Sequence, residues 1–86
     1  MNAKATMSAP RPPRQLDVRP FMAEGGEPFP KIMAAIAALQ PGDTLALITP
    51  FMPSPLIEKL QGEGFEARPE RRHDGAWETR FRRGDA

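Results

Sequence analysis

The chain has 86 residues, of which 40% are hydrophobic and 27% charged, and its formal net charge is +1. A chain of this length forms one small domain with little core. It has no cysteine and one histidine, which excludes disulfides, thiolate metal sites, thiol nucleophiles and sites built from several histidines.

Residues 1–14 carry Lys4, Arg11 and Arg14, no acidic side chain and several turn-forming prolines. They show no apolar periodicity, so we expect a disordered basic arm. They also lack the apolar stretch of a signal peptide, and the longest apolar run, residues 32–39, is too short to span a bilayer. We therefore expect a soluble, cytoplasmic protein without membrane contact.

The first predicted element is a short strand over residues 15–19. Polar and apolar residues alternate there, with Leu16 and Val18 on one face, and Pro20 is expected to end the strand. Residues 20–27, which include two adjacent glycines, are predicted to form a loop.

A helix is predicted from residue 28 up to Pro41-Gly42. Pro28 and Pro30 are tolerated because amide groups in the first turn of a helix have no partner within the helix. Apolar residues follow at the spacing of one helical face. This face comprises Phe29, Ile32, Met33, Ile36 and Leu39.

Residues 44–49 are apolar on both faces, which predicts a central strand of the sheet. A loop follows over residues 50–53. Ser54 is then suited to cap a second, short helix, with Pro55 at its first position. The apolar face of this helix is formed by Leu56, Ile57 and Leu60.

The C-terminal third predicts a β-hairpin, residues 65–72 and 76–83, joined by His73-Asp74-Gly75. A loop of three residues places Phe65, Ala67, Trp77, Thr79 and Phe81 on one face. The other face is then a solvated ladder of mixed charge: Glu66, Arg68, Glu70, Glu78, Arg80 and Arg82.

The predicted order is β-α-β-α-β-β. The first two strands are joined through a helix, which favours a parallel pair. We expect an α+β two-layer sandwich, in which two helices pack on one face of a four-stranded mixed sheet. The domain spans residues 15–83, between the arm of residues 1–14 and a frayed end at residues 84–86.

Several segments in this order resemble the SirA/TusA-like family of sulfur carriers. They are Leu16-Asp17-Val18-Arg19, Pro28-Phe29-Pro30, Pro41-Gly42-Asp43-Thr44-Leu45 and Gly62-Glu63-Gly64-Phe65. The closer resemblance is to its uncharacterised bacterial branch, domain of unknown function 2249. This resemblance covers residues 15–83 and implies the strand order 1-2-4-3, with strand 4 antiparallel to the others.

The resemblance also argues against the best-known activity of the family. The family's persulfide-carrying cysteine precedes the first proline of its C-P-x-P motif, and here that position is Glu27. A carboxylate cannot carry a persulfide. Glu27 is either a stabilising acid at the start of a helix or the mark of an inherited site now used for recognition.

The best candidate site follows the first two strands, where the tripeptide Pro-Phe-Met occurs twice. Parallel neighbours deliver their following loops to the same end of the sheet, where ligands of α/β sheets tend to bind. The apolar side chains there either fold inward to close a small core or form an exposed binding patch. The candidate binding residues are Glu27, Phe21, Met22, Phe51 and Met52.

The residues that could take part in catalysis or bind a metal do not indicate an enzyme. His73 is expected to be exposed in a turn and without metal, Ser8 lies in the arm, Ser54 is a cap, and no base neighbours either serine. We therefore expect no catalytic residue, no metal site and no cofactor.

The favoured interpretation is a non-catalytic accessory or interaction module that binds another protein and is itself a monomer. A small ligand or cofactor in a redox or sulfur-related setting is the first alternative, suggested by family analogy alone. The second is RNA binding by the hairpin arginines and the basic arm. Interleaved acids and a net charge of −2 over residues 15–86 argue against RNA. These arginines are Arg68, Arg71, Arg72, Arg80, Arg82 and Arg83.

Overall fold

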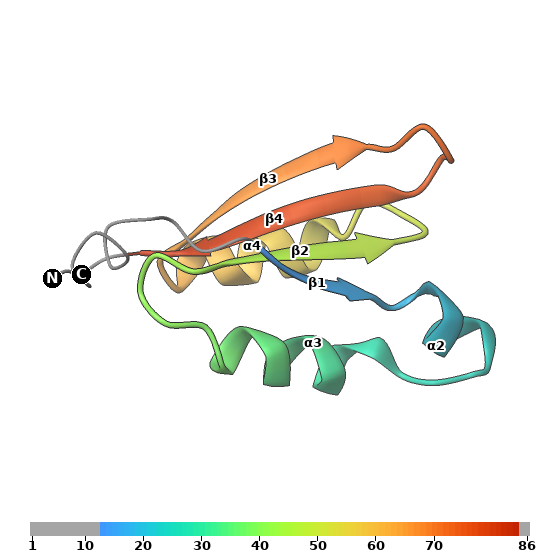
Figure 1. The fold of residues 1–86 in the computed structure, drawn as a ribbon, viewed down its shortest axis with the longest axis horizontal. Helices are drawn as coiled ribbons and strands as arrows, with labels where there is room; N and C mark the ends of the chain where they lie inside the picture. Colours follow the sequence, from blue (N-terminus) through green and yellow to red (C-terminus); the bar gives the residue numbers. More distant parts are fainter. Residues whose placement is uncertain (1–12, 85–86) are drawn as a thin grey trace, which may run out of the picture.

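A four-stranded sheet organises residues 13–84, the part of the chain that the computed structural model describes (Figure 1). The strand order is β1-β2-β4-β3, with β1 and β2 parallel and β4 antiparallel to both of its neighbours. This is the α+β fold expected from the sequence, and the strand order is the one that the family resemblance implied. The elements are β1 (Arg14–Asp17), α2 (Arg19–Ala23), α3 (Pro28–Ala37), β2 (Thr44–Thr49), α4 (Ser54–Gly62), β3 (Phe65–Arg71) and β4 (Trp77–Arg83).

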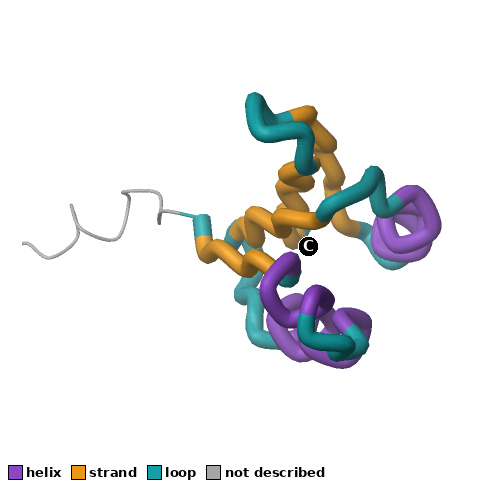
Figure 2. The backbone as a smooth tube through the Cα atoms, turned by 90° about the vertical axis from the view of Figure 1, so that its right-hand side faces the viewer, coloured by secondary structure: helices purple, strands orange, loops and turns teal. Residues whose placement is uncertain are grey.

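The two longer helices lie on the same side of the sheet (Figure 2). Their apolar faces meet alternate residues of the strands in a single buried cluster. This cluster includes Ile36 of α3, Leu60 of α4, Leu45 and Leu47 of β2, and Phe81 of β4. Burial of these side chains is the main source of stability, and the two-layer prediction is confirmed.

The β3–β4 hairpin closes as the sequence predicts. The Arg72 amide donates to the Ala76 carbonyl at 2.8 Å, which leaves a loop of three residues between them. Gly75 has a φ of +88°, a left-handed conformation that side chains disfavour. Ala67 pairs with Phe81 in the resulting register, so the apolar residues of both strands share the core face.

The segment after β1 differs from the prediction. The strand ends at Asp17, and residues 19–23 form the short helix α2 where a loop was expected. Pro20 is the second residue of this helix, where it is tolerated because a first-turn residue needs no N–H. The Asp17 carboxylate accepts the Arg19 amide at 3.0 Å and turns the chain out of the strand.

The start of α4 also differs by one residue. Ser54 is the first helical residue, Pro53 holds the N-cap position, and no side chain caps this terminus. The predicted capping role of Ser54 is therefore wrong. Pro55 still lies in the first turn, where the absence of its N–H costs no hydrogen bond.

Within residues 13–84, no helix covers the other face of the sheet, yet Ala46 and Ile48 of β2 are buried there. Ile48 lies between Asp17 and Glu78 in the register. Ion pairs join Asp17 to Arg19 and Glu78 to Arg72. Long charged side chains therefore exclude water from the centre of this face, which explains how β2 can be apolar on both sides.

Two predictions concern the ends of the chain. The basic arm, residues 1–14, lies outside the described residues except for Pro13 and Arg14, and Arg14 already belongs to β1. Of the predicted frayed end, residues 84–86, only Gly84 is described. Within residues 13–84, no helix has the length and apolar character needed to cross a membrane.

Candidate functional site

An apolar groove of about 310 Å³ opens at the carboxyl ends of β1 and β2. The parallel pairing of these strands brings α2 and residues 50–53 to the same end of the sheet, where α3 also begins (Figure 1). The groove is lined by Met22, Pro28, Phe29, Ile32, Thr49, Phe51, Pro53, Pro55, Leu56 and Lys59. The crevice predicted from the topology is therefore present, and its lining is almost wholly apolar.

Exposed apolar side chains mark this end of the molecule. Within residues 13–84, the large hydrophobic side chains that are most exposed are Phe51 (51%), Phe29 (48%) and Met52 (40%). The prediction that Phe29 belongs to the buried face of its helix is wrong. Phe29 is the second residue of α3, one turn before the helix meets the sheet through Ile32, so its ring lines the groove instead.

The five candidate residues are placed differently from one another. Met22 and Phe51 line the groove. Phe21 is half-buried against Gly26, and Met52 is exposed beyond the lining. Glu27 occupies the N-cap position of α3, where its side chain is exposed and makes no capping hydrogen bond.

The two Pro-Phe-Met segments differ: the first helps to close the core, and the second forms an exposed patch. Met22 packs against the core cluster and helps to close this end of the sheet. Phe51 and Met52 stay exposed. The groove thus has one wall that belongs to the core and one that projects into solvent.

The polar side chains of the lining are already engaged. The Thr49 hydroxyl donates to the carbonyl of Phe51 and holds the loop after β2 against the end of the strand. The Lys59 ammonium lies 2.9 Å from the Glu63 carboxylate, one turn along α4. The groove therefore offers apolar contact and few polar groups to orient a ligand.

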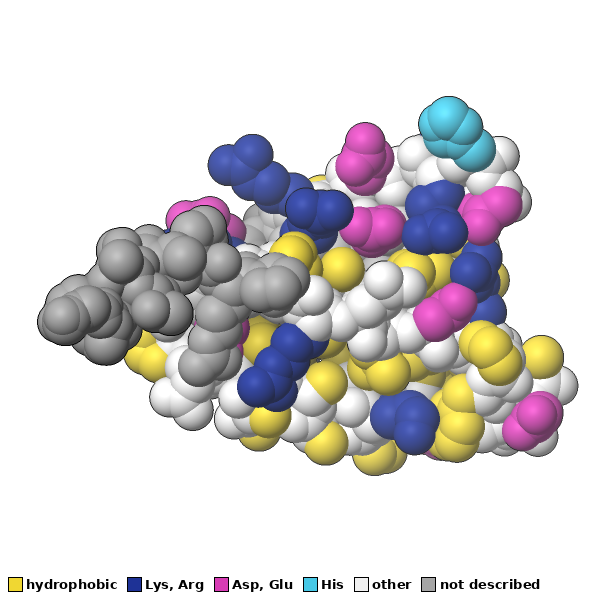
Figure 3. Space-filling view, in the orientation of Figure 1, with side chains coloured by type: hydrophobic (Ala, Val, Ile, Leu, Met, Phe, Trp, Pro, Cys, Tyr) yellow, Lys and Arg dark blue, Asp and Glu magenta, His cyan; other side chains and the backbone are white. Residues whose placement is uncertain are grey.

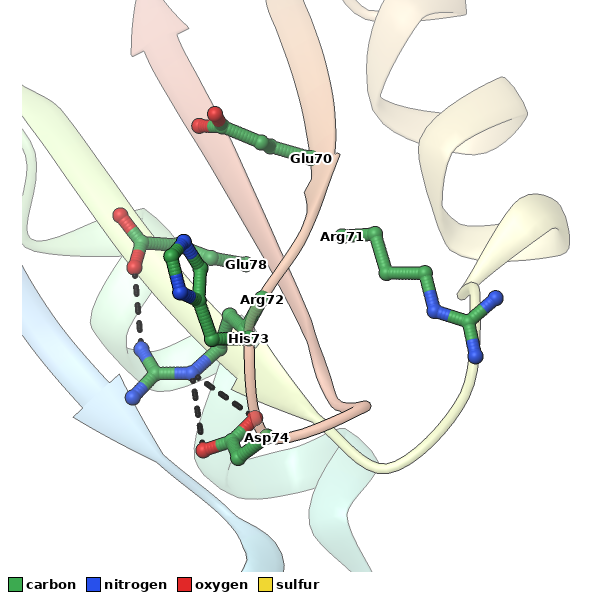
Figure 4. A pocket seen from close by; sticks show the side chains of 6 residues that line it. All are labelled: Glu70, Arg71, Arg72, His73, Asp74 and Glu78. Atoms are coloured by element: carbon green, nitrogen blue, oxygen red, sulfur yellow. Dashed lines mark hydrogen bonds and ion pairs between the residues drawn. The ribbon is translucent and has the colours of Figure 1, made fainter.

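A second hollow, of about 370 Å³, lies at the tip of the hairpin and is polar (Figure 4). Arg72 lies between two carboxylates, 3.3 Å from Asp74 and 3.2 Å from Glu78. Arg19 also reaches Asp74, at 3.0 Å, and so links α2 to the hairpin tip. Local sequence patterns carry no signal for this contact, because the two residues are 55 positions apart.

These contacts shift the acidity of two carboxyl groups. The Ala76 amide, followed by the Arg19 guanidinium, lowers the pKa of Asp74 to about 2. Hydrogen bonds from the Arg19 side chain lower the pKa of Asp17. In both cases the hydrogen bonds favour the charged carboxylate. Asp17 and Asp74 therefore stay charged at mildly acidic pH, so their ion pairs with Arg19 can hold α2 to the hairpin tip.

The other chemistry-bearing residues of the sequence, His73 and the two serines, either do not line the groove or lie outside the described residues. His73 is exposed at the hairpin tip, and Ser54 begins α4 at the surface. Ser8 lies outside the described residues. Among residues 13–84, no group of three His, Asp or Glu side chains could hold a metal ion.

Comparison with known proteins places the chain in a family. The sequence model of the family described as "Uncharacterized conserved protein (DUF2249)" matches residues 15–83, all of the sheet but its first residue. No curated protein and no solved structure matches the chain. On the extent of the family match, this chain belongs to the DUF2249 family.

Proposed function

We propose that the chain is a non-catalytic interaction module that binds a partner protein in the apolar groove at the carboxyl ends of β1 and β2. The single observation that carries this proposal is the position of Phe29 and Phe51. Both are about half exposed, and both line the same groove. Aromatic and methionine side chains gathered at one exposed place are typical of protein-binding surfaces.

The chemistry of the groove favours an apolar side chain as its occupant. A small polar ligand is normally oriented by a few convergent polar groups. Here Thr49 bonds to the Phe51 carbonyl and Lys59 pairs with Glu63. An apolar side chain of a partner needs no such groups, since its binding energy comes from the surface removed from water.

The proposal includes a SirA/TusA-like origin without the carrier chemistry. It is supported by the order β1-β2-β4-β3 and by the segments that resemble the family. Glu27 stands at the start of α3 in place of the carrier cysteine, and the chain contains no thiol that could hold a persulfide. In this proposal, the end of the sheet at which sulfur carriers hold their cysteine now binds a partner protein. The protein acts in the cytoplasm as a monomer.

A small apolar ligand is the second candidate. The groove volume of about 310 Å³ falls at the lower end of the usual range for ligand pockets, roughly 300–1,000 Å³. A redox or sulfur-related setting for such a ligand rests on the family resemblance alone.

Native mass spectrometry of the full chain, purified gently from the cells that make it, separates the two candidates. Wild type is compared with Phe51→Ser and with Ala38→Ser, an exposed control beyond the far end of α3. We expect a protein-sized adduct on wild type and the control that is lost from Phe51→Ser. An adduct of a few hundred daltons would instead support the small ligand, and an adduct retained by Phe51→Ser would contradict the groove as the site.

A further inference from the structure

The sheet face without helices carries like-charged side chains directly opposite one another. Arg68 of β3 pairs with Arg80 of β4, and one step further along Glu70 pairs with Glu78. The face is the mixed ladder that the sequence predicts, with Glu66 opposite Arg82 at the next step in the other direction. Like charges directly opposite destabilise an antiparallel pair, so stability alone does not favour the pairing of Arg68 with Arg80.

Arg68 and Arg80 of this face are only partly neutralised by the described residues. Within residues 13–84, Arg68 makes no ion pair. Arg80 uses its Nε to reach Glu78 at 3.2 Å, and Arg82 lies 3.9 Å from Glu66. A guanidinium has several N–H donors in a planar fork, so Arg68 and Arg80 keep donors that a ligand could use.

These side chains surround a hollow of about 150 Å³. Figure 3 shows basic side chains over this part of β3 and β4, with acidic side chains directly beside them. The hollow is lined by Pro13, Thr44, Glu66, Arg68, Arg80 and Arg82.

We propose that this arginine surface, formed by Arg68, Arg80 and Arg82, binds phosphate groups of a single-stranded nucleic acid. Guanidinium forks match phosphate oxygens in charge and geometry. Glu66 and Glu78 on the same face offset part of this attraction, and Arg68, which makes no ion pair within residues 13–84, contributes the largest share of it. The three arginines lie at two successive steps of the β3–β4 ladder, which fits neighbouring phosphates of a chain better than one small anion.

This surface is expected to contact the sugar-phosphate backbone of the nucleic acid and not its bases. The open-face positions of β3 and β4 hold only charged side chains, because Phe81 and Trp77 belong to the core face. Bases therefore find no aromatic surface for stacking here. The expected binding is insensitive to base sequence and strongly weakened by salt.

Fluorescence anisotropy of a labelled oligouridine, titrated with the full-length protein at several salt concentrations, tests the proposal. Arg68→Gln and Arg80→Gln are each expected to weaken binding by about tenfold at low salt. Each should also reduce the slope of log K against log salt by about 0.7. The matched control is Arg71→Gln, which removes the same charge from β3 but on the other sheet face (Figure 4), and it should bind like wild type.

Two results would overturn the proposal. One is the absence of oligouridine binding at low salt, and the other is an equal loss from Arg71→Gln and Arg68→Gln, which would indicate non-specific attraction only. Inorganic tripolyphosphate is titrated in parallel. If tripolyphosphate binds and oligouridine does not, the ligand is a small polyphosphate and the nucleic-acid assignment is wrong. Melting temperatures of all variants verify that they remain folded.

Discussion

The tripeptide Pro-Phe-Met follows both parallel strands, and the two copies behave in opposite ways. In the first copy, residues 20–22, Phe21 is half-buried and Met22 packs against the core. In the second, residues 50–52, Phe51 and Met52 are 51% and 40% exposed. The same three residues at the same end of one sheet thus close the core in one place and form an apolar rim in the other.

The difference arises from the residues around each tripeptide. Pro20 falls in the first turn of α2, which directs Met22 inward, and Gly26 leaves room for the Phe21 ring. After β2, residues 50–53 form no helix, and the Thr49 hydroxyl holds the Phe51 carbonyl. Side-chain type therefore did not decide exposure, whereas the local backbone did.

The largest expected effect comes from shortening the two methionines in turn. Met22→Ala removes side-chain contacts with the core and should lower the free energy of unfolding by about 2 kcal/mol. Met52→Ala removes an exposed side chain and should change it by less than about 0.5 kcal/mol. Urea denaturation measures both. Equal losses would show that the two copies are packed alike.

A smaller effect is expected from filling the space beside Phe21. A Cβ added at Gly26 would lie 2.5 Å from the end of the Phe21 ring, so the ring must turn toward solvent. Gly26→Ala should therefore destabilise the protein by about 1 kcal/mol and leave Phe21 exposed, as Phe51 is in the second Pro-Phe-Met segment. Gly62→Ala, which meets no atom within 4 Å, is the control. A fully stable Gly26→Ala variant would contradict the close approach.

The smallest effect concerns the ion pair between Arg19, next to the first Pro-Phe-Met segment, and Asp74 at the tip of the hairpin. The pKa of Asp74 is lowered from 3.8 to about 2 in the folded protein. The Asp74 carboxylate therefore stabilises the fold fully at pH values above its pKa of 3.8 in the unfolded chain. That effect is lost as the pH falls from about 4 toward 2. Melting temperatures should drop over this range, and Asp74→Asn should flatten the curve. Identical curves for both proteins would show that the contacts of Asp74 with the Ala76 amide, Arg19 and Arg72 do not lower its pKa.

The sequence predicted the sheet well because its signals there are local. Alternation placed Leu16 and Val18 on the core face, and the glycine at position 75 identified the hairpin loop. The missed helix α2 shows the limit of such signals, since Pro20 can either end a strand or begin a helix. Topology was also sufficient to place the groove at the carboxyl ends of the parallel strands.

The details of the site depend on information that local patterns do not carry. The spacing of Phe29 matched a buried helical face, but the helix meets the sheet only from Ile32 onward. The opposition of Arg68 and Arg80 follows from strand register, which one added loop residue would have changed. The link between Arg19 and Asp74 depends on the tertiary fold alone.

The most direct test of the account is photo-cross-linking inside the cells that make the protein. A benzophenone amino acid replaces Phe51 in the groove and, in a control, Ala38 at the exposed end of α3. The account predicts a discrete cross-linked protein from position 51 that is absent from position 38 and disappears when Phe29 is changed to serine. The same cross-linked species from both positions, or none from position 51, would contradict the groove as the interaction site.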